Sequence, residues 1–180
     1  LGAGDLTREE ALAQLSSTES KLQQLVDAQA PGEQAALDAL GRQLAQSDNP
    51  AARQAADALK NNRPDAAAEA LKGIDPSKMT EEQRQALADA LRQAAQDAAA
   101  NDPTLAQRLN DAAQALESND PAAAQQALEN LANDVNQTGQ NTLSQQELEQ
   151  ALAQIQQSKQ GLAGAGQPTP LAQNGTPGPT

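Results

Sequence analysis

The sequence contains no aromatic residue, no histidine and no cysteine, and one methionine among its 180 residues. These absences exclude the usual catalytic triads, zinc sites built from histidine and cysteine, and base-stacking surfaces for nucleic acid. Basic residues are also few, because 12 Lys and Arg stand against 24 Asp and Glu, for a net charge of -12. Since phosphate contacts need clustered positive charge, we predict no binding to nucleic acid and disfavour docking on an anionic membrane surface.

Long apolar runs are missing as well. No uninterrupted apolar segment approaches the roughly 20 residues that cross a bilayer, so we predict no transmembrane segment within this chain. The apolar residues that are present are nearly all alanine and leucine, accompanied by many glutamines. These residues favour helices, and the β-branched and aromatic residues that strands favour are scarce. The composition therefore predicts an all-α fold, an elongated array or bundle of about eight helices built from α-hairpins.

Helix starts are marked by short polar residues that can cap the first turn. Asp102 and Asp120 each precede a proline, which is favoured at the first helical position. Between 101 and 131, two apolar stripes at helical spacing are joined by a short turn, which predicts an α-hairpin. Further starts are indicated by three capping boxes, in which Ser or Thr is followed three positions later by Glu or Gln: Thr7 with Glu10, Thr80 with Gln83, and Ser144 with Glu147.

An internal repeat relates two stretches of the chain. Residues 55–74 match residues 112–131 at a constant offset, including Pro64 with Pro121 and Leu71 with Leu128. The pattern A-L-x-x-N-x-P-x-x-A-x-x-A-L resembles the inner turn of tetratricopeptide-type hairpins, by analogy only, since that family's large aromatic positions are absent. We predict one helical domain at 5–163, with an introductory helix pair at 5–47 and repeat units at 48–100 and 101–163. The Pro/Gly-rich residues 164–180 predict a flexible, disordered tail or linker.

One segment resembles a calcium-binding EF-hand loop. Oxygen-bearing side chains alternate before Gly139, and an acidic residue follows at the start of the next predicted helix, so the candidate calcium ligands are Asp134, Asn136, Thr138 and Glu147. The segment departs from that pattern by a two-residue surplus and by the lack of a partner loop. A glycine-containing interhelical loop followed by the Ser144 capping box explains the same residues. We therefore assign no metal, cofactor or catalytic residue.

The stretches DLTREEALAQL and ALESNDPAAAQQAL, within residues 5–163, resemble the Ala-rich soluble region of uncharacterised bacterial membrane-anchored proteins. That resemblance implies a tether to a membrane segment outside this chain and an extracytoplasmic or cell-surface location, with a cytoplasmic one left open. We predict a non-enzymatic helical scaffold, spacer or protein-protein interaction domain with a protein partner or self-association. The alternative is a ligand-sensing helical domain, in its most concrete form one that binds calcium at the EF-hand-like loop.

Overall fold

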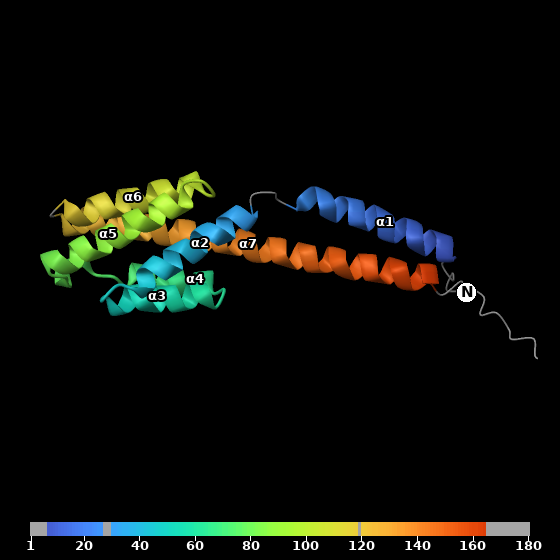
Figure 1. The fold of residues 1–180 in the computed structure, drawn as a ribbon, viewed down its shortest axis with the longest axis horizontal. Helices are drawn as coiled ribbons and strands as arrows, with labels where there is room; N and C mark the ends of the chain where they lie inside the picture. The colour runs from blue at the N-terminus through green and yellow to red at the C-terminus, as the bar shows by residue number, and fades with distance from the viewer. Residues whose placement is uncertain (1–6, 27–29, 119, 165–180) are drawn as a thin grey trace, which may run out of the picture. The chain divides into compact units, whose positions relative to one another are not determined.

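The computed structural model describes residues 7–26, 30–118 and 120–164, and this part of the chain is helical without any strand. The all-α prediction is confirmed, although seven α-helices replace the expected eight or so within the described ranges. No helix of this part is long and apolar enough to cross a membrane. Figure 1 shows the elements, which are α1 (Arg8–Leu25), α2 (Ala30–Ala45), α3 (Pro50–Lys60), α4 (Pro64–Lys72), the 3-10 helix η1 (Pro76–Lys78), α5 (Glu81–Ala98), α6 (Pro103–Glu117) and α7 (Pro121–Gly164).

The chain divides into two compact units, while the single helical domain expected at 5–163 and its repeat units stay predictions. Unit 1 comprises Leu1–Val26 and Leu148–Thr180, and unit 2 comprises Asp27–Glu147. Helix α7 supplies its first part to unit 2 and its last part to unit 1. The predicted tail at 164–180 lies outside the described residues, except for Gly164, which is the last residue of α7.

Most of the predicted caps start helices. Two of the three predicted capping boxes, at Thr7 and at Thr80, are present with their reciprocal hydrogen bonds. Asp102 Oδ1 accepts a hydrogen bond from the backbone N–H of Leu105 at 2.9 Å. Asp120 Oδ1 accepts two hydrogen bonds, from the backbone N–H groups of Ala122 and Ala123 in α7, at 3.0 and 3.1 Å. These bonds satisfy donors that the first turn of each helix leaves without a partner.

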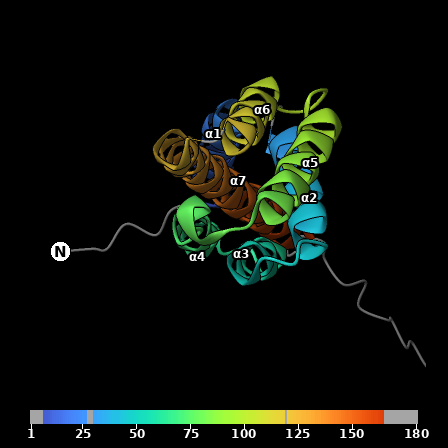
Figure 2. The same cartoon turned by 90° about the vertical axis from the view of Figure 1, so that its left-hand side faces the viewer.

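The core of unit 2 is made of leucine and alanine. Figure 2 shows α2 to α6 arranged around the first part of α7, and the apolar stripe of each helix points into that assembly. Alanine at many of these positions lets helix axes approach closely, while leucine fills the space between them. The predicted stripes of the 101–131 hairpin and its extension are all buried: Leu105, Leu109, Ala112, Ala113, Leu116, Ala124, Leu128, Leu131 and Val135.

The interhelical loop and the capping box predicted around Ser144 are wrong, because α7 runs without interruption through both. Gly139 has no positive φ and is buried where α7 meets α4. A Cβ built on it would lie 2.3 Å from Pro64 Cβ, so this glycine serves close helix approach rather than a turn. Thr142 Oγ1 donates to the carbonyl of Thr138 at 2.7 Å, which satisfies its buried hydroxyl inside the helix.

The helix boundaries agree with the repeat offset up to the start of α7. Helix α3 ends at Lys60 and α6 ends at Glu117, while α4 begins at Pro64 and α7 at Pro121. The third helix expected in the repeat unit at 101–163 is not a separate element, since it is part of α7. The internal repeat and the hairpin architecture stay predictions.

Candidate protein-interaction site

The four candidate calcium ligands do not form a loop. Asp134, Asn136, Thr138 and Glu147 all lie on α7. At a rise of about 1.5 Å per residue, Asp134 and Glu147 are separated by about 20 Å along the axis, which is far beyond the span of one ion's ligand sphere. The EF-hand interpretation is therefore wrong.

The polar groups of this segment also have other partners. Asp134 Oδ2 pairs with Arg108 Nε at 2.9 Å and thereby joins α7 to α6. Asn136 Oδ1 accepts a hydrogen bond from Gln140 Nε2 at 3.0 Å, one helical turn further on. Among residues 7–26, 30–118 and 120–164, no group of three or more acidic side chains is placed to hold a metal ion. The calcium-sensing alternative thus loses the site on which it depended.

A groove with a volume of about 570 Å³ lies between α2 and α3 of unit 2. The Asn49 side chain caps the start of α3 by accepting hydrogen bonds from the backbone N–H groups of Ala51 and Ala52 at 2.9 and 3.1 Å. The short connection before Pro50 then returns the chain alongside α2. Two neighbouring helices with small facing side chains leave a depression that larger side chains would fill.

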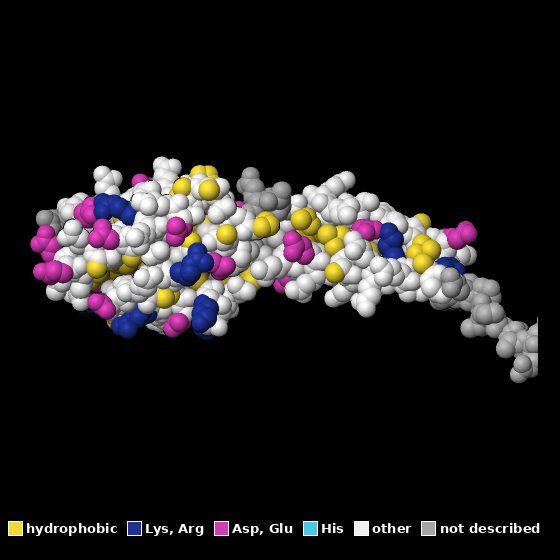
Figure 3. Space-filling view, in the orientation of Figure 1, with side chains coloured by type: hydrophobic (Ala, Val, Ile, Leu, Met, Phe, Trp, Pro, Cys, Tyr) yellow, Lys and Arg dark blue, Asp and Glu magenta, His cyan; other side chains and the backbone are white. Residues whose placement is uncertain are grey.

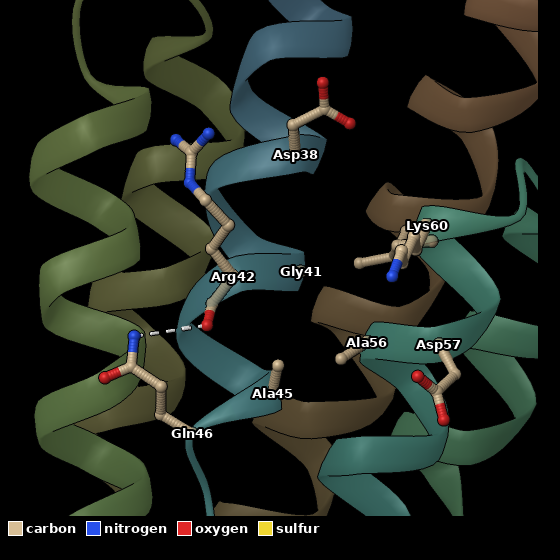
Figure 4. Close-up of a pocket in the computed structure, with 9 residues that line it drawn as sticks. Asp38, Gly41, Arg42, Ala45, Gln46, Ala56, Asp57 and Lys60 are labelled. Atoms are coloured by element: carbon tan, nitrogen blue, oxygen red, sulfur yellow. Dashed lines mark hydrogen bonds between the residues drawn. The ribbon is translucent and has the colours of Figure 1, made fainter.

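Small side chains form the floor of this groove. Figure 4 shows Ala45 on α2 and Ala56 on α3 on facing sides, with Gly41 one turn before Ala45. A Cβ at Gly41 would lie 3.5 Å from Leu59 Cβ, so the helices are already in ordinary contact beneath the groove. Ala45 is exposed and Ala56 is buried, which places the opening above Ala45. The floor is apolar and shallow enough for a backbone to approach.

Charged side chains of both signs border the groove. Asp38 and Arg42 lie one turn apart on α2, and Asp57 and Lys60 lie one turn apart on α3. Within residues 30–118 and 120–147, none of these four forms an ion pair with another described residue. Figure 4 shows the Arg42 side chain extending away from α3, while the Gln46 side chain donates to the Arg42 carbonyl at 3.3 Å. The rim therefore carries two carboxylates and two cations; Asp38 accepts a hydrogen bond from Gln34 Nε2 at 2.9 Å, and the Arg42 guanidinium points away from α3.

On the side of unit 2 that Figure 3 shows, acidic and basic side chains are interspersed among small hydrophobic patches. Sequence reasoning did not find the groove, because it depends on which helices are neighbours. The one local signal was the spacing of Gly41 and Ala45, four residues apart on a single helix face. An apolar floor with a mixed-charge rim is suited to noncovalent binding of a polypeptide segment.

Comparisons of the chain with protein-family models, with curated proteins and with solved structures return no match. The resemblance to Ala-rich regions of bacterial membrane-anchored proteins stays a prediction, together with the tether and location that it implies.

Proposed function

We propose that the chain is a non-enzymatic helical scaffold whose unit 2 holds an α-helix of a partner protein in the groove between α2 and α3. The observation that carries the proposal is the combination of a small-residue floor with four rim charges that have no ion-pair partner among the described residues of the unit. A helix is the favoured ligand because a floor of Gly41, Ala45 and Ala56 permits close helix–helix approach.

The dimensions of the groove suit a short helix. Helices of 16 and 11 residues, α2 and α3, extend for about 24 and 16 Å. A partner helix of three to four turns fits along such walls. Its buried face would carry small or medium apolar side chains at i and i+4, because the floor offers no deep pocket for an aromatic ring. Its flanks would carry both charge signs, to pair with Asp38 on one side and with Asp57 and Lys60 on the other.

A displayed library of helical peptides, selected for binding to the full chain, tests this proposal. Ala45→Arg fills the opening from an exposed position without touching the core, and Ala86→Arg, at an exposed position of α5, is the matched control. We expect selected peptides to lose about tenfold or more of their affinity for the Ala45→Arg variant and to bind the Ala86→Arg variant unchanged. Selected helices that bind both variants equally, or a selection that yields no helical binder, would overturn the proposal.

A further inference from the structure

Unit 1 is an antiparallel helix pair. Figure 1 shows α1 beside the last part of α7, and two long-range contacts set the direction. Arg8 Nη2 donates to the carbonyl of Ala163 at 2.6 Å, and Lys159 Nζ contacts Glu19 Oε2 at 2.5 Å. As the residue number rises along α1, the number of its partner on α7 falls, which is the signature of antiparallel helices.

Both helices carry a seven-residue repeat along their line of contact. Alternating steps of three and four residues connect the seam positions, which are Leu12, Leu15, Glu19, Leu22 and Val26 on α1 and Leu148, Leu152, Ile155, Lys159 and Leu162 on α7. Every one of these ten side chains is half-buried, and α1 has no fully buried residue. In unit 2, by contrast, the leucines of the apolar helix stripes are completely or almost completely buried.

A second row of uncharged side chains lies on one side of this seam. In an antiparallel pair, the positions that immediately precede the first seam position of each repeat face one another across the same edge. Here they are Ala11, Thr18 and Leu25 on α1 and Ala151 and Ser158 on α7. The opposite edge holds Glu9, Ser16 and Gln23 on α1 and Glu149, Gln156 and Ala163 on α7, all of them exposed, and it is polar except at Ala163. We call the first set the uncharged edge.

The polar members of the uncharged edge already satisfy their hydroxyl donors. Thr18 Oγ1 donates to the carbonyl of Gln14, and Ser158 Oγ donates to the carbonyl of Gln154, both at 2.9 Å. Their burial in an interface would therefore leave no hydroxyl donor without a partner. Leu25, on the same edge, is 60% exposed and is the most exposed large apolar side chain among the described residues. Figure 3 shows hydrophobic patches along the line between α1 and the last part of α7.

The seven-residue pattern of α1 and of the last part of α7 is typical of helices that pack against more than one neighbouring helix. A two-stranded coiled coil uses two apolar positions in seven, whereas the helices of a bundle use three. With the uncharged edge included, both helices of unit 1 have the wider, three-position face. One partner helix covers only part of it, which explains why the seam leucines stay half-buried.

A second copy of unit 1 is the occupant that charge and area favour. The described residues of unit 1 contain three basic and four acidic side chains, for a net charge of -1, whereas the whole chain carries -12. Two such faces meet with little repulsion, and neither presents a charge that a polar partner would need to match. Two helices about 27 Å long and about 10 Å apart bury roughly 1,000 Å² in total with an identical face, which reaches the lower limit for a specific interface.

We propose that unit 1 self-associates through its uncharged edge, so that two copies of the hairpin form a four-helix bundle. The α2–α3 groove takes no part in this contact, because all of its lining residues belong to unit 2. The Glu19–Lys159 pair lies in the seam of each hairpin, where Gln156 Nε2 adds a hydrogen bond to Glu19 at 3.3 Å. A polar layer of this kind fixes register and helix direction.

Sedimentation equilibrium of the full chain over a wide concentration range tests the proposal. We expect the wild-type chain to dimerise reversibly. Thr18→Arg, on the uncharged edge, should weaken dimerisation by about tenfold or more, since it places a charge at the contact. Ser16→Arg, an exposed hydroxyl residue two positions away on the polar edge, is the matched control and should leave the dissociation constant unchanged.

Two further variants keep the outcomes distinct. Thr18→Ala removes a hydroxyl without adding charge or bulk and should dimerise at least as tightly as the wild type, which separates a contact effect from a folding defect. Ala45→Arg, which blocks the groove, should leave dimerisation unchanged, so the two proposals can fail separately. A chain that is monomeric throughout the range, or equal dissociation constants for Thr18→Arg and Ser16→Arg, would contradict self-association through this edge.

Discussion

Replacement of Gly139 by alanine tests the packing of α7 against α4. Sequence reasoning placed this glycine in a loop, whereas the structure buries it in a helix with Pro64 directly opposite. The added Cβ would lie 2.3 Å from Pro64 Cβ and 2.9 Å from Pro64 Cγ. The proline ring cannot rotate away, because it fixes its own φ and begins α4. The clash must therefore be relieved by a shift of one helix.

Two opposing effects set the magnitude. Alanine is favoured over glycine in a helix interior by about 1 kcal/mol, which stabilises the variant. Overpacking a buried contact costs about 1–3 kcal/mol, and a rigid neighbour at this distance favours the upper half of that range. We expect a net loss of about 1–2 kcal/mol, which for a unit of this size lowers the melting temperature by roughly 3–10 °C.

Gly41→Ala is the matched control, because Gly41 also lies within a helix of unit 2. Its added Cβ would lie 3.5 Å from Leu59 Cβ, an ordinary contact, so this variant should gain up to about 1 kcal/mol. Urea unfolding followed by helical circular dichroism measures both. Opposite signs for the two substitutions support the packing, whereas stabilisation by both would refute the close approach of Gly139 to Pro64. A Pro64→Gly/Gly139→Ala cycle should show favourable coupling, since glycine removes the atoms that clash.

Two other predictions concern polar groups at helix contacts and helix ends. The guanidinium of Arg92 forms a two-pronged pair with Glu117, Nη1 to Oε1 at 2.5 Å and Nη2 to Oε2, and these hydrogen bonds lower the pKa of Glu117. Because the folded-state pKa of Glu117 lies below the unfolded one, the stabilisation is present above the unfolded pKa and is lost as pH falls through the folded pKa. Glu117→Gln should therefore flatten the acid side of a pH–stability curve measured by urea midpoints. Asp120→Ala should destabilise the chain by about 1 kcal/mol, since it removes the cap of α7, while Asp120→Asn retains most of the stability and Asp111→Ala, at an exposed mid-helix position, has little effect in thermal melts.

The features that the sequence could predict are local ones. Caps at Thr80, Asp102 and Asp120 depend on residues within four positions of each other, and the buried stripes follow from the period of a single helix. These predictions are confirmed because neighbouring elements hardly influence them. The all-α class follows from composition in the same way.

The features that the sequence could not predict depend on which helices become neighbours. Nearly every apolar stripe of this chain is made of alanine and leucine, so the sequence does not specify which helix packs against which. Neither the groove nor the division into two units therefore follows from the sequence pattern. Unit 1 pairs Glu19 with Lys159, which are 140 positions apart. The seven-residue spacing that identifies this pair is visible in each helix, but it gains meaning only when the two helices are known to meet.

The failed capping box at Ser144 shows what interrupts helices in such a chain. Five described elements begin with a proline, at Pro50, Pro64, Pro76, Pro103 and Pro121. Even the working box at Thr80 follows a break that Pro76 has already made. At the offset of the predicted repeat, the position of Pro76 corresponds to Asn133, and no proline follows Pro121 within α7. A capping box can stabilise a helix start only where the backbone has left the helix. Here the high helix propensity of the alanine-rich sequence and the burial of Gly139 against Pro64 favour a continuous α7.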